Sequence, residues 1–281
     1  MATFYNQATL TYRGGTVNSN IVSATLSEAL SVSKTSALDT YRVGERMTYT
    51  VGIVNSSDTP VSTVTLTDDL GAYAFGTSTL YPLSYVSGSI TLLIDGIPAA
   101  VTVTDTQPLT VGGFSIPAQS SAVIVYNATV TEFAPPAPDG EIVNTVTVNS
   151  LGAPVSATET VNAEAGALLT MIKEVEPDTV TGDGPLTYTL IVQNQGNTEA
   201  GAGDDVVISD VFDPILTITE VTLNSVVLTE GVDYTYNSAT GEFATVSGRV
   251  TVPAATYDRD PVSGAYTVIP GSTVLTVSGT V

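Results

Sequence analysis

Apolar and polar residues alternate along most of the chain, which is the period of a β-strand rather than that of a helix. Two clear examples are MTYTVGIVN (47–55) and LTYTLIVQN (186–194), which place Tyr and Val on one face and Thr on the other. Turn sequences such as NSSDTP, IDGIP and DPVSG follow at the spacing of a β-sandwich. We therefore expect an all-β protein built from two tandem immunoglobulin-like β-sandwich domains.

The alternating segments belong to two copies of one domain. Lys34 matches Lys173 and Tyr49 matches Tyr188, and the same offset along the chain separates both pairs. This period is far too long for a solenoid unit, so each copy is expected to be a whole domain.

Repeat 1 is assigned to 26–163 and repeat 2 to 164–281, with 1–25 as an N-terminal donor strand and linker. The strand that ends at Val130 corresponds to the one that ends at Val281. Repeat 1 then continues through one more alternating segment, so repeat 2 is expected to lack its last strand.

The segment FYNQATLTY (4–12) resembles the repeat 1 segment IVNTVTVNS (142–150). The match places Asn6 on Asn144, and the tripeptide SAT follows both segments. We therefore predict that the N-terminal segment supplies the missing strand of a repeat 2. Its donor residues are Phe4, Tyr5, Ala8, Leu10 and Tyr12.

A sandwich without its last strand exposes unpaired backbone groups and an apolar groove. Strand addition from another chain fills such a groove, as in the donor-strand complementation of pilins. Exchange between subunits is head-to-tail and does not close, so it makes a filament. The alternative is a monomeric surface adhesin or spacer whose N-terminal strand folds back onto its own repeat 2. The general preference for short connections favours exchange.

Composition narrows the chemistry. The chain has 281 residues, a net charge of −21, and no Cys, His or Trp. Disulfides and thiolate sites are therefore excluded, and nucleic acid and anionic membranes are disfavoured as partners. No segment is apolar enough for membrane insertion, and the opening residues lack the pattern of a secretory signal. The expected partner is a further copy of the chain.

The only two lysines, Lys34 and Lys173, occupy equivalent positions on the first strand of each repeat. With Asp68 on a middle strand and Asn144 on the last, Lys34 resembles the intramolecular isopeptide sites of Gram-positive pilin and adhesin domains. In an apolar core the amine loses its proton more easily and can attack the Asn carboxamide, while the Asp carboxyl promotes the reaction. Ammonia leaves, and an amide cross-link remains.

In repeat 2, Lys173 and Asp210 have no such Asn on a terminal strand of their own, and Asn6 of a donated strand would supply it. A buried Lys–Asp ion pair capped by Asn is one alternative, and a register that keeps the residues apart is another. Asp69 is the alternative to Asp68, but strand alternation favours Asp68.

Other functional classes have weaker support. Acidic residues cluster at Asp204–Asp205 and at Asp258 and Asp260, where oxygen ligands could hold calcium, but solvated turns fit them better. We expect no cofactor, and no enzyme activity beyond autocatalytic cross-linking. A calcium- or glycan-binding module is the third functional class.

The chain resembles a repeat family of bacterial and archaeal surface proteins called domain of unknown function eleven. The resemblance is carried by the motifs K, TYTV, N and VTLTDDL in this order, by their second copy, and by VNTVTV. The resemblance covers essentially the whole chain. It implies an immunoglobulin-like fold in an extracellular setting, on a cell or spore surface, without implying a reaction.

Overall fold

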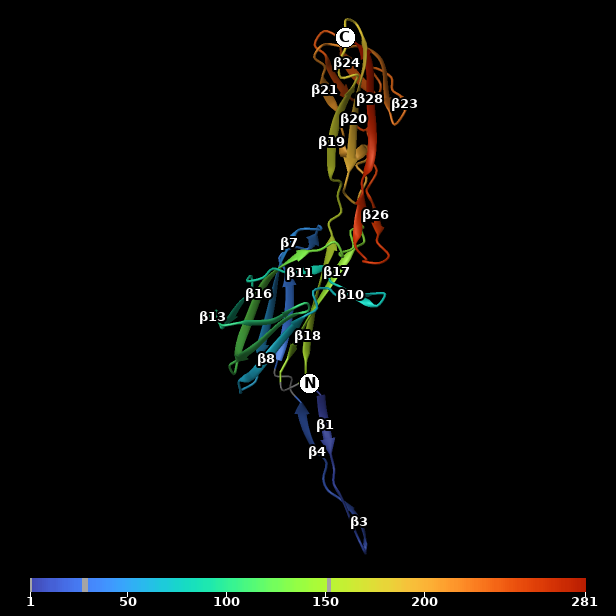
Figure 1. The fold of residues 1–281 in the computed structure, drawn as a ribbon. Coiled ribbons are helices and arrows are strands. Elements are labelled where there is room, and N and C mark those ends of the chain that lie inside the picture. The colour runs from blue at the N-terminus through green and yellow to red at the C-terminus, as the bar shows by residue number, and fades with distance from the viewer. Residues whose placement is uncertain (1, 27–29, 151–152) are drawn as a thin grey trace. The chain divides into compact units, whose positions relative to one another are not determined.

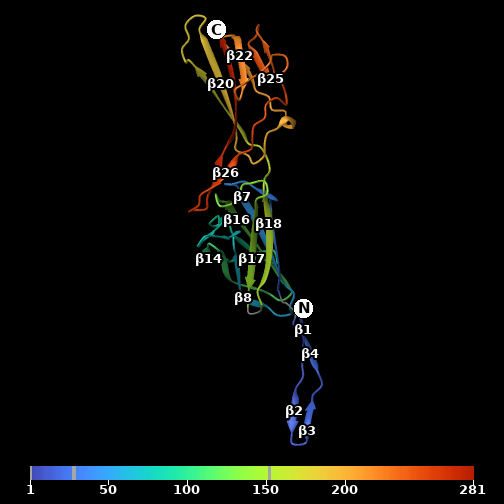
Figure 2. The ribbon, with the colours of Figure 1, turned by 90° about the vertical axis from the view of Figure 1, so that its right-hand side faces the viewer.

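The computed structural model describes residues 2–26, 30–150 and 153–281. The chain forms two compact units, one of residues 1–134 with 141–161 and the other of residues 135–140 with 162–281. We call the sandwich formed by β5–β18 domain 1 and the one formed by β19–β28 domain 2. The predicted all-β, immunoglobulin-like fold is confirmed, and each domain is described below by itself (Figures 1 and 2).

The first described residues form a separate β-ribbon, which we call the N-terminal hairpin. Its strands are β1 (Ala2–Asn6), β2 (Thr9–Tyr12), β3 (Gly15–Asn18) and β4 (Val22–Leu26). β1 pairs with β4 and β2 with β3, both antiparallel. Gly15 has a φ of 146°, a value that favours glycine, and it lets the chain reverse after Tyr12. The prediction of a single strand followed by a linker was therefore wrong, because the segment after Tyr12 is the return strand of a hairpin.

Domain 1 consists of two antiparallel sheets and two short outlying strands. The strands are β5 (Leu30–Ser36), β6 (Thr40–Tyr41), β7 (Arg46–Asn55), β8 (Val61–Asp68), β9 (Tyr73–Phe75), β10 (Ser78–Leu80), β11 (Leu83–Tyr85), β12 (Thr91–Ile94), β13 (Ile97–Ala99), β14 (Thr102–Thr106), β15 (Leu109–Ile116), β16 (Ser120–Val130), β17 (Glu141–Asn149) and β18 (Val155–Ala163). The order of one sheet is β13-β12-β16-β7-β5, and that of the other is β14-β15-β8-β17-β18-β6. Within them, β5-β7-β16-β12 and β8-β17-β18 reproduce the A-B-E-D and C-F-G sheets of an immunoglobulin sandwich.

Domain 2 repeats this order only in part. Its elements are β19 (Leu169–Glu176), β20 (Pro185–Asn194), η1 (Ala202–Asp204), β21 (Ser209–Val211), β22 (Thr217–Leu223), β23 (Val226–Val227), β24 (Tyr234–Asn237), β25 (Glu242–Thr245), β26 (Thr256–Arg259), β27 (Tyr266–Ile269) and β28 (Gly271–Thr280). The sheet β19-β20-β28-β22-β23 has the same order as β5-β7-β16-β12-β13 of domain 1, where β11 also pairs with β16. The second sheet is β21-β25-β24, so β21 occupies the position of β8 and stands at an edge.

The second sheet of domain 2 therefore differs from that of domain 1 by more than the sequence predicted. In domain 1, β8 is followed by β17 and then by β18. Among the described residues of domain 2 no strand occupies either position. The predicted lack of the last strand of repeat 2 therefore extends, among the described residues, to two positions, because a β-hairpin occupies both of them in domain 1.

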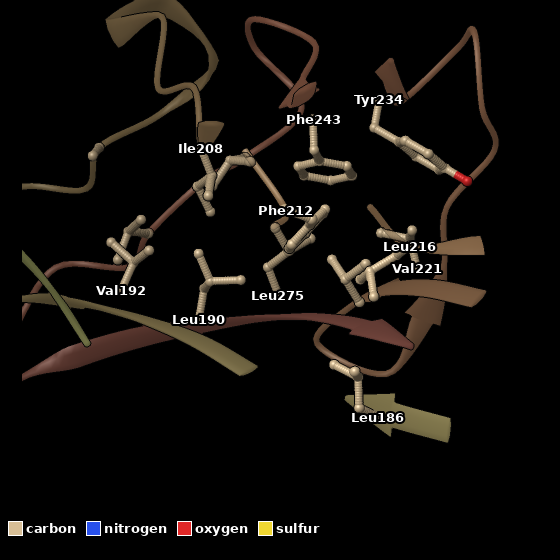
Figure 3. Close-up of a cluster of buried hydrophobic side chains, with 14 residues drawn as sticks. Leu186, Leu190, Val192, Ile208, Phe212, Leu216, Val221, Tyr234, Phe243 and Leu275 are labelled. Carbon is tan, nitrogen blue, oxygen red and sulfur yellow. The ribbon is translucent and has the colours of Figure 1, made fainter. Parts of the chain in front are cut away.

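Both domains nevertheless have a packed apolar core. In domain 2, Phe212 lies amid buried aliphatic and aromatic side chains (Figure 3) and stacks on Tyr188 with ring centroids 5.2 Å apart. In domain 1, the rings of Tyr49 and Tyr126 stack with their centroids 5.6 Å apart. Because each core is formed by its own domain, the lysine sites can be compared between the two.

Candidate functional site

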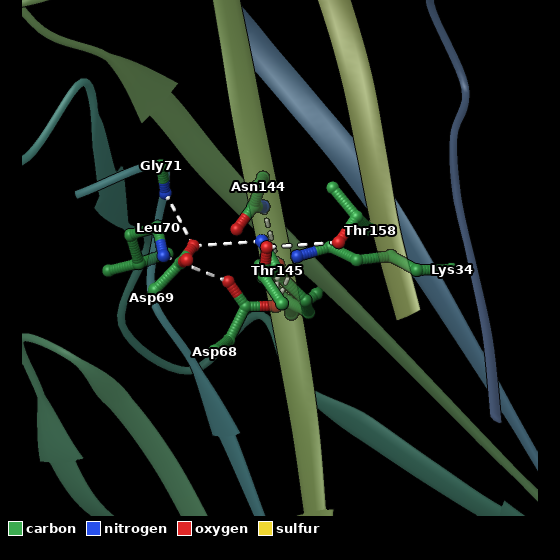
Figure 4. A network of polar contacts seen from close by, with 9 residues as sticks. Lys34, Asp68, Asp69, Leu70, Gly71, Asn144, Thr145 and Thr158 are labelled. Atoms are coloured by element: carbon green, nitrogen blue, oxygen red, sulfur yellow. Dashed lines mark hydrogen bonds and ion pairs between the residues drawn. The ribbon is translucent and has the colours of Figure 1, made fainter. Parts of the chain in front are cut away.

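An ion pair between the two sheets forms the centre of the site in domain 1. Lys34 extends from the edge strand β5, and its Nζ lies 2.7 Å from Oδ2 of Asp68 at the end of β8 (Figure 4). Neither side chain has any exposed surface. The second carboxyl oxygen of Asp68 accepts a hydrogen bond of 3.0 Å from the Leu70 backbone N–H. Such a pair is retained in a core only when its polar atoms are satisfied in this way.

Tyr126 and Asn144 complete the site. The Tyr126 hydroxyl, from β16, donates a 2.6 Å hydrogen bond to Oδ2 of Asp68. The Nδ2 group of Asn144, on β17, donates to the same hydroxyl at 3.3 Å. Asn144 is fully buried, and its Oδ1 atom has no hydrogen-bond partner. The structure thus places Lys34, Asp68 and Asn144 in one connected cluster, with Tyr126 between the last two.

Burial sets the electrostatics of this cluster. It lowers the pKa of the Lys34 amine, and the charge and hydrogen bond of Asp68 oppose the shift only in part. Burial also raises the pKa of the Tyr126 phenol, which keeps that group protonated and able to donate. A lysine with a lowered pKa is deprotonated more readily, and the neutral amine is its nucleophilic form. The cluster therefore combines a potential nucleophile, a carboxyl group and a carboxamide in a buried site.

The neighbouring carboxylate, Asp69, has a different role. Its Oδ1 atom accepts hydrogen bonds from the backbone N–H groups of Thr145 at 2.8 Å and Gly71 at 2.9 Å. It therefore fixes the turn after β8 against β17. Of the two adjacent aspartates, it is Asp68 that contacts the lysine.

The equivalent pair in domain 2 is intact but open to solvent. Lys173 on β19 forms an ion pair with Asp210 on β21. The side chains are 39% and 16% exposed, whereas both members of the domain 1 pair are at 0%. The lysine lies over the equivalent tyrosine ring in both domains, with Nζ 5.2 Å from the Tyr49 centroid and 4.5 Å from that of Tyr188. The lysine, the aspartate and the tyrosine beneath the amine thus recur in both domains, while the exposure of the ion pair differs.

The whole of β19 shares this exposure. Leu30 of β5 is 6% exposed, while its counterpart Leu169 is 39% exposed. Met171, two residues further along β19, is 54% exposed. Every residue of β19 is exposed although the strand is fully paired with β20. Domain 2 thus presents an apolar surface and an unpaired strand edge beside its lysine.

The predicted donor residues all lie on the N-terminal hairpin. Asn6 ends β1, where it is exposed and pairs with Val22 of β4. The other five are exposed as well: Phe4, Tyr5, Ala8, Leu10 and Tyr12. Tyr5 points to the face opposite Phe4, because successive residues of a strand alternate. In the described chain, Asn6 is therefore available to a partner rather than buried as Asn144 is.

Sequence reasoning missed Tyr126. Comparison of the repeats did not identify it, because the tyrosine is not repeated. Tyr126 lies opposite Tyr49 in domain 1, whereas Val277 lies opposite Tyr188, the equivalent of Tyr49, in domain 2. The only signal was its inward position in the alternating strand SSAVIVYNATV. The hydroxyl that joins Asp68 to Asn144 is thus specific to domain 1.

One aspartate of each acidic cluster caps a turn. Asp204 accepts a hydrogen bond from the Gly201 N–H, and Asp260 accepts from the N–H groups of Val262 and Ser263. No group of three or more potential metal ligands occurs in the part of the chain that the structure describes. Nor is any helix there long and apolar enough to cross a membrane.

No family model and no curated protein sequence matches the chain. Among solved structures, the major pilin subunit of Bacillus cereus is 12% identical and aligns over 96% of this chain and 73% of its own, with a TM-score of 0.37. The pilus backbone of Streptococcus pneumoniae is 13% identical over 86% of this chain and 55% of its own, with a TM-score of 0.36. A collagen-binding domain from a Staphylococcus aureus adhesin is 15% identical over 49% of this chain and 99% of its own, with a TM-score of 0.31. At these TM-scores the likenesses carry no conclusion about what the chain does.

Proposed function

We propose that the chain is a structural subunit of an extracellular filament that assembles head to tail on a cell or spore surface. Residues 4–12 of one subunit enter domain 2 of the next, beside β21. The observation that carries this proposal is the contrast between the two lysine sites. The domain 1 site is covered by β17, while the domain 2 site is open at the corresponding edge.

The donor and the acceptor fit in sequence. When Asn6 takes the position of Asn144, Phe4 falls on Ile142 and Leu10 on Val148, both of which are buried in domain 1. The donor side chains are 57% and 65% exposed in the free hairpin. Burying a large apolar side chain stabilises a complex by about 1.5–3 kcal/mol. The main chain of the donor also pairs with the free edge of β21, as in other cases of strand addition.

The seated strand brings Asn6 to the Lys173–Asp210 pair. The neutral Lys173 amine then attacks the Asn6 carboxamide carbon, and Asp210 promotes proton transfer to the departing nitrogen. One C–N bond forms and one breaks, with ammonia as the leaving group, so no oxidant or cofactor is required. The same reaction between Lys34 and Asn144 cross-links domain 1 internally.

Donor and acceptor lie on different parts of one chain, so each subunit has one of each. Contacts of this kind repeat without closing and generate an open polymer. The cell-envelope setting rests on the resemblance to domain of unknown function eleven. The competing function is a monomeric adhesin or spacer, in which the donor segment returns to its own domain 2.

The experiment compares the purified chain with Asn6→Ala and with a matched control, Asn20→Ala, which alters an exposed asparagine of the same hairpin. Each sample is boiled in denaturant, separated on a gel, and its monomer is weighed by intact mass spectrometry. We expect a ladder of multimers in the wild type and in Asn20→Ala, and monomer alone in Asn6→Ala. A wild-type monomer lighter by two ammonia molecules would instead establish the fold-back alternative. A wild-type monomer that lacks any loss would overturn the cross-linking chemistry.

A further inference from the structure

The N-terminal hairpin has one apolar face and one polar face, and both of its strands contribute to each. On the face of Asn6 and Leu10, Val22 lies opposite Asn6 and Val17 lies opposite Leu10. The other face pairs Tyr5 with Ser23 and Thr9 with Asn18. Apart from Tyr5 on the polar face, the second strand therefore follows the same pattern as the first, with apolar side chains on one face and polar side chains on the other.

A specific cross-strand contact relates this hairpin to β17–β18 of domain 1. The Thr9 hydroxyl donates to Oδ1 of Asn18 at 2.9 Å, and the hydroxyls of Thr147 and Ser156 lie 2.9 Å apart. Thr9 and Thr147 are separated by the same number of residues as Asn18 and Ser156. The same offset thus relates β2 and β3 to β17 and β18 on either side of the turn, whereas one extra residue in the return strand places Val22 rather than Ile21 opposite Asn6. The match of the two SAT tripeptides requires a shorter offset, which does not agree with the observed pairing.

We propose that each subunit donates the whole N-terminal hairpin rather than a single strand. β1–β2 take the position of β17 beside β21, and β3–β4 take the position of β18 and become the outer strands of the completed sheet. This inference rests on the proposed function and specifies its donor. The occupant of the acceptor edge is thus a two-stranded ribbon from a second copy of the chain.

The width of the gap supports this assignment. Two strands separate β8 from β6 in domain 1, and β21 has neither of them among the described residues of domain 2. Donation of one strand would also require the hairpin to open. That would break the β1–β4 and β2–β3 pairing and leave the apolar face of the return strand in water, where Val17 and Val22 are already 54% and 56% exposed.

The ribbon also gains from association. An isolated two-stranded hairpin is at best marginally stable in water, and it becomes stable when it packs through a hydrophobic face. Seating the intact ribbon keeps its own backbone hydrogen bonds and adds those to β21. The donor is therefore preorganised, which lowers the ordering cost of association.

The test places a charge on either face of the return strand in the full chain. Val22→Asp and Val17→Asp alter the apolar face, and Ser23→Asp and Thr16→Asp are the controls on neighbouring exposed positions of the polar face. Aspartate is used because its short side chain cannot reach water from a covered position, as lysine can. All four positions are exposed in the free hairpin, so the variants retain the fold of the monomer. Leu10→Asp on the first strand serves as the positive control.

We expect Val22→Asp and Val17→Asp to lose the boil-resistant ladder, as Leu10→Asp does, while both polar-face controls retain it. If the two valine variants assemble like the wild type and only Leu10→Asp fails, then a single strand is donated, and the hairpin inference is overturned while the proposed function stands. If the wild type itself forms no multimers, the proposed function fails. The two failures are therefore distinguishable on one gel.

Discussion

Replacement of Asn144 by alanine separates a covalent bond in domain 1 from an ion pair. An amide between Lys34 and Asn144 closes a loop of about 110 residues. A cross-link of that span restricts the unfolded chain and stabilises the fold by roughly 4–5 kcal/mol, if it acts as a disulfide of equal span does. Asn144→Ala removes this contribution entirely, because the loop can no longer close.

Without the bond, the same substitution has a much smaller effect. Asn144 then contributes one hydrogen bond of 3.3 Å to Tyr126, while its Oδ1 atom has no partner. Loss of a neutral hydrogen bond costs about 1 kcal/mol. The two interpretations therefore differ by roughly 3–4 kcal/mol in the free energy of unfolding of domain 1.

Scanning calorimetry measures the difference, and intact mass reports the bond. For a domain of this size, 1 kcal/mol corresponds to roughly 4 °C in Tm. We expect the domain 1 transition to fall by roughly 16–20 °C in Asn144→Ala. Asn149→Ala, an exposed position on the same strand, is the matched control and should change Tm very little.

Two results would refute the reasoning. The first is a wild-type chain at its full calculated mass, which would have no Lys–Asn cross-link in either domain. A drop of only about 4 °C in Asn144→Ala would show that Asn144 acts through its hydrogen bond alone. The chemistry proposed for domain 2 would then lose its precedent within the chain.

The two ion pairs and the buried lysine give further predictions. In the Asn144→Ala background, where the Lys34 amine is free, Asp68→Ala leaves this buried amine unpaired and should lower the free energy of unfolding of domain 1 by about 3–5 kcal/mol. Asp210→Ala breaks a partly exposed pair and should cost domain 2 of the monomer at most about 1 kcal/mol, so equal losses in urea unfolding would contradict the difference in burial. In Asn144→Ala, burial lowers the pKa of the free Lys34 amine below its unfolded value of 10.5, so the unfolded chain binds that proton more tightly. The free energy of unfolding should therefore rise as the pH is raised toward 10, and Lys34→Met should remove the slope; a fall would contradict the lowered pKa.

Strand alternation and the repeat offset predicted much of the site. The offset paired Lys34 with Lys173, and alternation turned Asp68 rather than Asp69 toward the core. Both inferences use the strand period, which is a local property of the sequence. Tyr126 was not predicted because the equivalent residue of repeat 2 is Val277. Comparison of the repeats therefore identified the lysines but not the tyrosine hydroxyl.

The return strand of the hairpin was missed for a different reason. The Gly14–Gly15 pair is a turn signal, but the match to a single strand of repeat 1 covers 4–12 alone, so it predicts a linker after Tyr12. Strand register is set by cross-strand contacts such as that between Thr9 and Asn18, which no single segment of sequence reveals. The width of the gap in domain 2 likewise depends on the strand order of the whole sheet.

The positions of the cross-linking residues have a mechanical consequence. Lys34 lies on the first strand of domain 1 and Asn144 on its last strand but one, while Asn6 and Lys173 lie just outside these points along the chain. Once both amides have formed, tension on a filament runs along 6–34, crosses to Asn144, runs along 144–173 and passes to the next subunit. The remaining strands of both sandwiches lie off this path and carry no load. Such a fibre resists extension by covalent bonds, and its domains remain folded under forces that would unravel an uncross-linked chain.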